Sequence, residues 1–162
     1  MEEIIQKVKN LSIGFKSQKG HEISILKNIT TNIKKGETVG IVGESGSGKS
    51  TLALAMMGYV KQGLYTMKGE CLFNSSNLLI MNNRELEKIR GRKIAMIPQN
   101  AGQSLTPNLK IGYQVDEALK LHTNLNKNER DKKISELLNK VRLPSPETIA
   151  LRYPHELSGG QQ

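Results

Sequence analysis

The chain reads Gly43-Glu44-Ser45-Gly46-Ser47-Gly48-Lys49-Ser50 near the end of its first third, and this segment matches the pattern GxxxxGK(S/T). An apolar run with branched side chains precedes it at 38–42, and residues 51–57 are rich in good helix formers. A strand, a glycine-rich loop and a helix in that order are the context in which the pattern binds phosphate groups. We therefore predict a buried parallel strand over 38–42, a phosphate-binding loop and a helix that begins near Lys49.

The residue types in this loop suit a polyphosphate. Its three glycines allow backbone conformations that a Cβ atom forbids, so successive N–H groups can point at one anion. Lys49 adds a positive charge, the Ser50 hydroxyl can coordinate Mg²⁺, and Thr51 offers a second hydroxyl. The start of the following helix directs unpaired N–H groups and the positive end of its dipole to the same place. We expect a nucleoside triphosphate to bind here.

Composition favours one domain outside the membrane. The 162 residues are enough for one core, and no apolar stretch approaches the length of a membrane span. The N-terminus lacks the pattern of a signal peptide, so we expect a cytosolic chain. A single cysteine, Cys71, excludes an internal disulfide and reads as a small core residue, and three scattered histidines predict no metal cluster.

The net charge of +9 leaves several partners open. Phosphate ligands, nucleic acid and an anionic membrane surface would each suit it. The basic residues are nevertheless dispersed along the chain, which favours an ordinary solvated surface.

The remaining patterns predict a β-rich first part and a helical last part. Alternating residues at 4–33 indicate an antiparallel hairpin, and a further strand is expected at 68–73. A short helix over 83–90 precedes a second buried strand over 94–97, which Pro98 ends. Two amphipathic helices are predicted between 111 and 141, and the residues expected in the turn and N-cap between them are Asn124, Asn126 and Asn128.

The last residues, Leu157-Ser158-Gly159-Gly160-Gln161-Gln162, match the LSGGQ signature of ATP-binding-cassette (ABC) ATPases. Because the signature follows the phosphate loop by about 110 residues and a helical insert lies between them, the chain resembles this family over nearly its whole length. The resemblance implies an α/β P-loop NTPase fold with a RecA-like parallel sheet, an N-terminal antiparallel β subdomain and an α-helical subdomain, incomplete at the C-terminus. It divides the chain into an antiparallel part at 1–36, a nucleotide-binding core at 37–100, a helical subdomain at 101–156 and the signature at 157–162.

The resemblance also assigns roles to residues. Gln99 is similar to the Q-loop glutamine, which contacts Mg²⁺ and the attacking water, and the Q-loop senses the transmembrane partner. Phe15 lies near the family's aromatic residue that stacks on adenine, although it equally suits the core of the hairpin. The loop from Gly43 to Thr51 would bind ATP, and Ser50 of this loop would bind Mg²⁺ together with Gln99. The signature residues would act in trans on the nucleotide of a second subunit, and they are Ser158, Gly159, Gly160 and Gln161.

Finer similarity favours one branch of the family. Residues 84–91, 94–99, 104–107 and 153–157 resemble subunits that drive import of dipeptides, oligopeptides or nickel complexes, whereas Asn100-Ala101-Gly102-Gln103 departs from their usual acidic residue, proline and methionine. The implied partners are a second ATP-binding subunit, in a homo- or heterodimer, transmembrane permease subunits and, indirectly, an extracellular solute-binding protein. The implied location is peripheral, on the cytoplasmic face of the membrane, and no nucleic acid is expected. The alternative is a soluble ABC ATPase that acts on nucleic acid or ribosomes, and the positive net charge is the only feature that supports it.

Two further family motifs are not found in these residues: an apolar strand ending in Asp-Glu, known as Walker B, and a later switch histidine. Both act in hydrolysis, so we expect this chain to be a fragment that does not hydrolyse ATP by itself. The strands that separate the two predicted parallel strands in the family would also be missing, which predicts low stability and exposed apolar edges.

Overall fold

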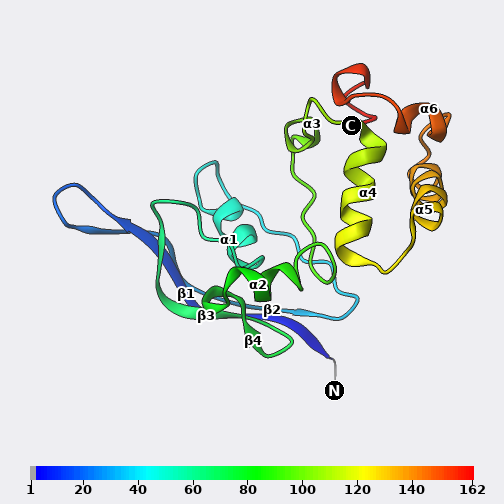
Figure 1. Cartoon of the computed structure of the whole chain (residues 1–162). Coiled ribbons are helices and arrows are strands. Elements are labelled where there is room, and N and C mark those ends of the chain that lie inside the picture. The colour runs from blue at the N-terminus through cyan, green and yellow to red at the C-terminus, as the bar shows by residue number, and fades with distance from the viewer. Residues whose placement is uncertain (1–2) are drawn as a thin grey trace. The chain divides into compact units, whose positions relative to one another are not determined.

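The computed structural model describes residues 3–162, apart from the side chain of Ala101. It divides into two compact units, Met1–Ile94 and Ala95–Gln162, and each is described by itself. Figure 1 shows the first unit built around β-strands and the second built from helices. Among the described residues, no helix is both long and apolar enough to cross a lipid bilayer.

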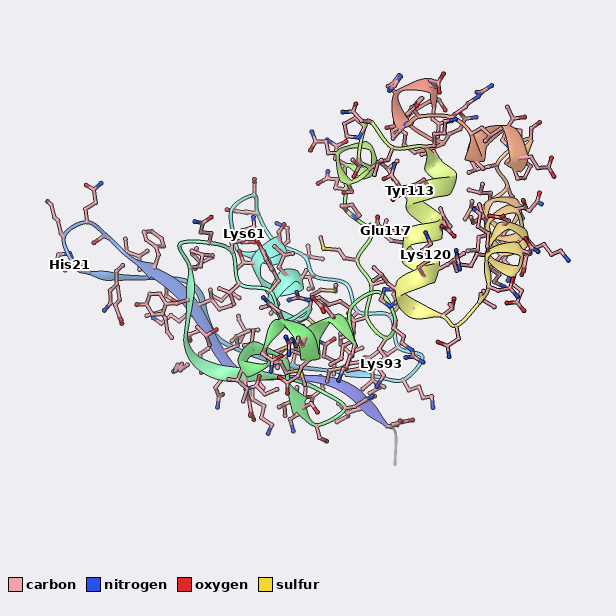
Figure 2. All side chains as sticks on the ribbon, viewed as in Figure 1. His21, Lys61, Lys93, Tyr113, Glu117 and Lys120 are labelled. Carbon is pink, nitrogen blue, oxygen red and sulfur yellow. The ribbon has the colours of Figure 1, made fainter. Side chains whose placement is uncertain are left out.

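The first unit contains a four-stranded antiparallel sheet. Strands β1 (Ile4–Lys16) and β2 (Glu22–Lys34) form the predicted long hairpin, with His21 at its tip (Figure 2). Strand β3 (Tyr65–Phe73) includes the strand expected at 68–73, and β4 (Ser76–Asn77) is a two-residue edge. The strand order β2-β1-β3-β4 places β1 in the interior of the sheet, which explains why its apolar side chains are the most deeply buried.

One face of this sheet packs against helix α1 (Lys49–Ala55), the helix predicted after the loop. The core contains fully buried residues of β1 and β3, among them Ile13 and Cys71, together with Leu26 of β2. Leu52 and Ala55 are the buried residues of α1. Cys71 is fully buried, which confirms its place as a small core residue, and this burial raises the pKa of its thiol.

A short helical region completes the first unit. The 3₁₀ turn η1 (Leu78–Ile80) is followed by α2 (Asn83–Glu87), where Asn82 and Glu85 form a reciprocal capping box. The helix predicted over 83–90 is therefore present but shorter. The chain turns after α2, and Gly91 in this turn has a positive φ of +77°.

Two predicted strands do not form within residues 3–162. Residues 38–42 form no strand, and the run at 94–97 has only an isolated parallel bridge between Arg90 and Ile94. A strand requires a neighbouring strand that pairs with its N–H and C=O groups along its length, and neither run has such a strand among the described residues. Val42 is therefore 96% exposed and Ile97 93%. The prediction of two buried strands is wrong for this chain, whereas the expected exposure of their apolar side chains is confirmed.

The second unit is helical, as predicted for this part of the chain. The two amphipathic helices are α4 (Ile111–His122) and α5 (Lys127–Lys140), and they flank a short turn. Asn126 caps α5 through a reciprocal box with Glu129, which confirms an N-cap in the asparagine-rich turn. Three short elements were not predicted: α3 (Ala101–Ser104), α6 (Pro146–Ala150) and the 3₁₀ turn η2 (Pro154–Glu156).

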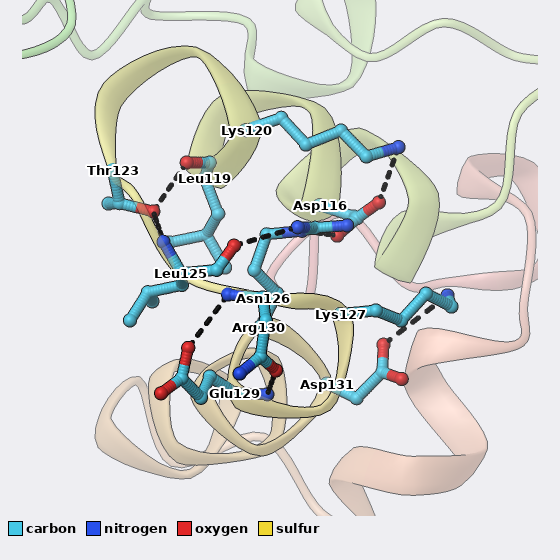
Figure 3. A network of polar contacts seen from close by, with 10 residues as sticks. All are labelled: Asp116, Leu119, Lys120, Thr123, Leu125, Asn126, Lys127, Glu129, Arg130 and Asp131. Carbon is cyan, nitrogen blue, oxygen red and sulfur yellow. Dashed lines mark hydrogen bonds and ion pairs between the residues drawn. The ribbon is translucent and has the colours of Figure 1, made fainter.

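An ion-pair network that is buried at Asp116 and Arg130 joins α4 to α5. The Asp116 carboxylate, on a residue only 7% exposed, accepts hydrogen bonds from Arg130 Nε and, at 2.9 Å, from Lys120 Nζ (Figure 3). Arg130 also donates from Nη1 to the Leu125 carbonyl in the connecting turn, at 2.9 Å. The hydrogen bond from Arg130, reinforced by Lys120, lowers the pKa of the Asp116 carboxyl. The network links the two helices of this hairpin, whose apolar side packs on Ile149 and Leu157.

Candidate nucleotide-binding site

The glycines of the loop at 43–50 have the backbone geometry that their residue type predicts. Gly46 has φ +84° and Gly48 has φ +89°, which residues with a Cβ atom rarely adopt. At Gly43 the reason is space, since an added Cβ would lie 2.8 Å from Ser47 Oγ. All three glycines are therefore needed for this path of the backbone.

Lys49 folds back over the loop that precedes it. Its Nζ donates to the carbonyl oxygens of Gly43 at 2.8 Å and Glu44 at 2.6 Å. The Glu44 carbonyl also accepts from the Ser47 N–H at 3.2 Å, so it is held from two sides within the loop. These bonds place the positive charge of Lys49 at the loop, as an anion site requires.

The loop continues directly into α1. Gly48 is the N-cap, and its carbonyl accepts from the Leu52 N–H at 2.9 Å. Ser50 and Thr51 are in the first turn, and no acidic residue lies there to compete with a bound anion. A depression of about 300 Å³ opens at this point, and it is lined by Ile25, Gly46, Gly48, Lys49, Ser50 and Thr51.

Strand β2 fixes the loop from the side. A Cβ atom at Gly48 would lie 2.7 Å from Leu26 Cδ2 and 3.2 Å from the Ile25 carbonyl oxygen. The loop therefore rests on the sheet at a place where only glycine fits. Ile25 was not predicted as a site residue, because nothing in the alternating pattern of β2 distinguishes it from its neighbours.

Phe15 and Gln99 occupy accessible positions in different units. Phe15 is partly exposed near the end of β1, opposite Ile23 of β2, and it does not belong to the buried core. Gln99 is exposed in the segment between Pro98 and α3. Among residues 3–162 no group of three or more His, Cys, Asp or Glu side chains could hold a metal ion. Ser50 supplies a hydroxyl oxygen at the loop, and the roles of Ser50 and Gln99 as Mg²⁺ ligands stay predictions.

The signature residues form a single exposed turn. Leu157 is buried in the core of the second unit, whereas Ser158, Gly159 and Gly160 are exposed. The Ser158 carbonyl accepts from the Gln161 N–H at 2.9 Å, and Gln161 Oε1 accepts from the Ser158 N–H at 3.1 Å. One end of the turn is thus anchored by an apolar side chain, and its glycines remain open to a ligand.

The segment with the unusual sequence Asn100-Ala101-Gly102-Gln103 contacts the end of this turn. Gln162 Nε2 donates to the Pro154 carbonyl at 2.7 Å, and its Oε1 lies where a Cβ atom of Gly102 would be, at 2.1 Å. Gly102 therefore leaves room for Gln162. A side chain as large as methionine at this position would require Gln162 to move.

The largest depression described, about 630 Å³, lies elsewhere on the sheet. Its charged residues include Lys9 and Glu70, which pair with each other at 2.7 Å. No part of the phosphate loop lines it. The depression at the phosphate loop is therefore the smaller of the two.

Comparison with known proteins identifies one family and its relatives. A family model described as "ABC transporter" matches residues 26–162. The oligopeptide transport ATP-binding protein OppD of Bacillus subtilis (strain 168) is 39% identical over 156 residues, which are 96% of this chain and 43% of that protein. The dipeptide transport ATP-binding protein DppD of Lactococcus lactis subsp. cremoris (strain MG1363) is 38% identical over 162 residues, which are 99% of this chain and 46% of that protein. The chain thus spans less than half the length of these relatives.

Solved structures show the same likeness. The ATP-binding cassette MJ0796, in a dimeric post-hydrolysis state bound to ADP and Pi, superposes with a TM-score of 0.81 and 33% identity. The match covers 96% of this chain and 64% of that one. The cbiO1 protein from Clostridium perfringens, part of the ABC transporter complex cbiONQ, superposes with a TM-score of 0.68 and 25% identity. This match covers 99% of this chain and 59% of that one.

Proposed function

This chain belongs to the ABC transporter family and has the fold of an ABC ATPase cassette, and from this premise we propose that it is part of an ATP-binding subunit that powers peptide import. The observation that carries the proposal is the cradle at 43–51, where Lys49 and two glycines at positive φ face the depression beside Ser50. The relatives named for oligopeptide and dipeptide transport support peptides as the substrate class. Glutathione import, named in GsiA of Escherichia coli, fits the same class, because glutathione is a tripeptide.

In the proposed site the loop N–H groups and Lys49 bind the β- and γ-phosphates of ATP. Ser50 and Gln99 are the residues that would hold Mg²⁺, and the fit rests on their neutral oxygen donors. When bound, the ion supplies positive charge that balances the charge of the phosphates. Phe15 would stack on the adenine ring, where its partial exposure leaves the ring accessible.

The proposed subunit works as a dimer on the cytoplasmic face of the membrane. The exposed signature turn, with Ser158 at its start, would complete the site of the second subunit. The helical unit would transmit closure of the dimer to permease subunits, and a solute-binding protein would deliver the peptide. Net charge is the one feature that would favour action on nucleic acid or ribosomes, and none of the relatives named above is described in those terms.

Nucleotide binding is tested by titrating the purified protein with a fluorescent ATP analogue in the presence and absence of Mg²⁺. We expect saturable binding that unlabelled ATP reverses and that Lys49→Ala abolishes. The matched control is Lys132→Ala, which removes an exposed lysine from α5 and should leave the titration unchanged. Loss of binding in both variants, or in neither, contradicts the proposed site.

The transport role is tested in cells that require imported dipeptides or oligopeptides for growth. Disrupting the gene should abolish uptake of a labelled peptide, and the intact gene should restore uptake where the Lys49→Ala gene does not. Normal peptide uptake after disruption would overturn the proposed substrate class, even if ATP binding is observed.

A further inference from the structure

Gln162 ties the exposed signature turn to the packed part of the second unit. Its backbone N–H donates to the Ser158 carbonyl at 3.1 Å, which closes the turn. Its side-chain Nε2 donates to the carbonyls of Pro154 at 2.7 Å and Leu157 at 3.4 Å. One partly buried residue therefore joins the turn to η2 and to the start of the signature.

Both side-chain acceptors belong to well-packed parts of the unit. Pro154 is buried in η2, and Leu157 is buried in the core that it shares with residues of α4, α5 and α6. By contrast, Gly159 and Gly160 are exposed and have nothing within 4 Å of an added Cβ atom. Because packing does not order these glycines, hydrogen bonds must order the turn, and those of Gln162 connect it to the core.

Gly102 of α3 lies against the other side of the Gln162 amide, and Figure 1 shows α3 beside the C-terminal turn. A Cβ atom at Gly102 would lie 2.1 Å from Oε1 and 3.1 Å from Cδ of Gln162, which is inside van der Waals contact. Gly102 follows Gln99 by three residues. The segment after Gln99 and the signature turn therefore meet at a place where only glycine leaves room for the amide.

A second glutamine fixes the rest of this segment to the helices. Gln114 of α4 accepts from the Thr106 N–H at 2.9 Å through Oε1, and its Nε2 donates to the carbonyls of Thr106 at 3.1 Å and Leu109 at 2.8 Å. One amide thus satisfies three backbone groups of the loop between α3 and α4. Because this loop is held, a larger side chain at Gly102 has to displace the flexible end of Gln162.

We infer that Gln162 is a positioning residue of the signature, and that Gly102 is the position after Gln99 that permits its contacts. The inference rests on the proposed function, because it assumes that the signature turn completes the site of the second subunit. The depression at the phosphate loop is lined by residues of the first unit. A defect at Gln162 therefore acts on the partner's nucleotide and leaves the subunit's own ATP affinity unchanged.

The test uses the assembled transporter, with each variant made in a subunit that also carries Walker B and the switch histidine. Gln162→Glu keeps the size of the side chain but cannot donate to the two carbonyls, and Gly102→Met displaces the amide. Each should lower phosphate release by about five- to thirtyfold, the loss expected for one or two hydrogen bonds, and keep the Kd of the fluorescent ATP analogue within about twofold. The double variant should be no worse than the more severe single one, because both changes break the same contacts. The matched controls, Gln103→Glu and Gln103→Met, alter an exposed glutamine of α3 and should change neither quantity.

Mixed dimers identify which motif Gln162 serves. A Gln162→Glu subunit paired with a Lys49→Ala subunit has one site in which loop and signature are both intact, so phosphate release should rise well above that of either homodimer. Paired with a Ser158→Arg subunit, it has no site with an intact signature, and release should stay low. A defect of general folding would not distinguish the two partners.

Unchanged phosphate release in Gln162→Glu overturns the inference, as does a loss in the double variant equal to the product of the two single losses. Lower ATP affinity in Gln162→Glu, or recovery with Ser158→Arg in place of Lys49→Ala, overturns it too, because Gln162 would then act on its own subunit. If Lys49→Ala and Ser158→Arg subunits do not restore activity to each other, the proposed action in trans fails, and that failure is seen without any change at Gln162.

Discussion

The Nζ atom of Lys49 lies 2.6 Å from the carbonyl oxygen of Glu44, five residues earlier in the same loop. A second bond at 2.8 Å, to the Gly43 carbonyl, means that one tetrahedral ammonium group holds both carbonyls. The lysine therefore shapes the loop as well as supplying charge to it. This dual role makes its replacement by another cation informative.

We expect Lys49→Arg to lower ATP affinity by about 10- to 100-fold although the charge is kept. The guanidinium group is planar and longer, so it cannot donate to both carbonyls from one compact point, and charge-assisted bonds of this kind contribute about 1.5–3 kcal/mol each. Titration with the fluorescent ATP analogue measures the effect. An affinity within twofold of that of the unmodified protein would show that charge alone is sufficient.

Gly48 should tolerate a Cβ atom much less well than a glycine of similar backbone conformation in open space. Gly48→Ala combines φ +89° with contacts of 2.7 Å to Leu26 and 3.2 Å to Ile25, whereas Gly63, at φ +84°, has nothing within 4 Å of an added Cβ. We expect Gly63→Ala to lower the free energy of unfolding by about 1 kcal/mol and Gly48→Ala by about 2–4 kcal/mol. Urea unfolding measures both.

Nucleotide titration separates the two glycine variants further. Only Gly48→Ala should also lose ATP binding, since Gly63 lies outside the loop. Equal unfolding free energies in the two variants would mean that β2 does not restrict the loop at Gly48.

Local sequence patterns were sufficient to predict those elements that depend on contacts between residues close together in the sequence. The start of α1 at Lys49, the positive φ of Gly46 and Gly48, and the cap at Asn126 follow from residue type and from contacts within a few positions. The long hairpin β1–β2 was predictable for the same reason. Its alternation and its turn lie within one continuous segment.

Long-range features were not predictable in this way. The run at 38–42 has the composition of a buried strand, yet among residues 3–162 it has no neighbour to pair with, and its side chains are exposed. Ile25 became a lining residue through a register shift between two strands, and no residue in β2 marks the place of that shift. The contact of Gln162 with Gly102 joins positions 60 residues apart, and no local pattern around either residue predicts it.

Two inactive variants should restore activity to each other if the signature acts on the nucleotide of the partner subunit. Both variants are made in a subunit that also carries Walker B and the switch histidine. Ser158→Arg places a bulky charge on the exposed turn, and Lys49→Ala removes charge from the loop, so we expect each homodimer of the assembled transporter to lack ATPase activity. A mixed dimer has one site with both motifs intact and one site with both altered. We expect mixing to recover part of the activity, measured as phosphate release, whereas no recovery would contradict action in trans.

The Asp116 network predicts a specific dependence of stability on pH. The carboxyl pKa is lowered in the folded protein, first by the hydrogen bond from Arg130 and then by Lys120, so folding favours the ionised form. The ionised Asp116 carboxylate stabilises the fold fully at pH values above the unfolded-state pKa of about 3.9. This stabilisation is lost as the pH falls below about 3.9 and through the lower folded-state pKa. Asp116→Asn should therefore lower the urea midpoint at pH 7, and the difference from the unmodified protein should shrink as the pH falls below about 4. The control is Asp131→Asn, because Asp131 forms an exposed 3.7 Å pair with Lys127 and its loss should change the midpoint little at either pH. A difference between Asp116→Asn and the unmodified protein that is constant across this range would show that the carboxyl contributes through packing and not through its charge.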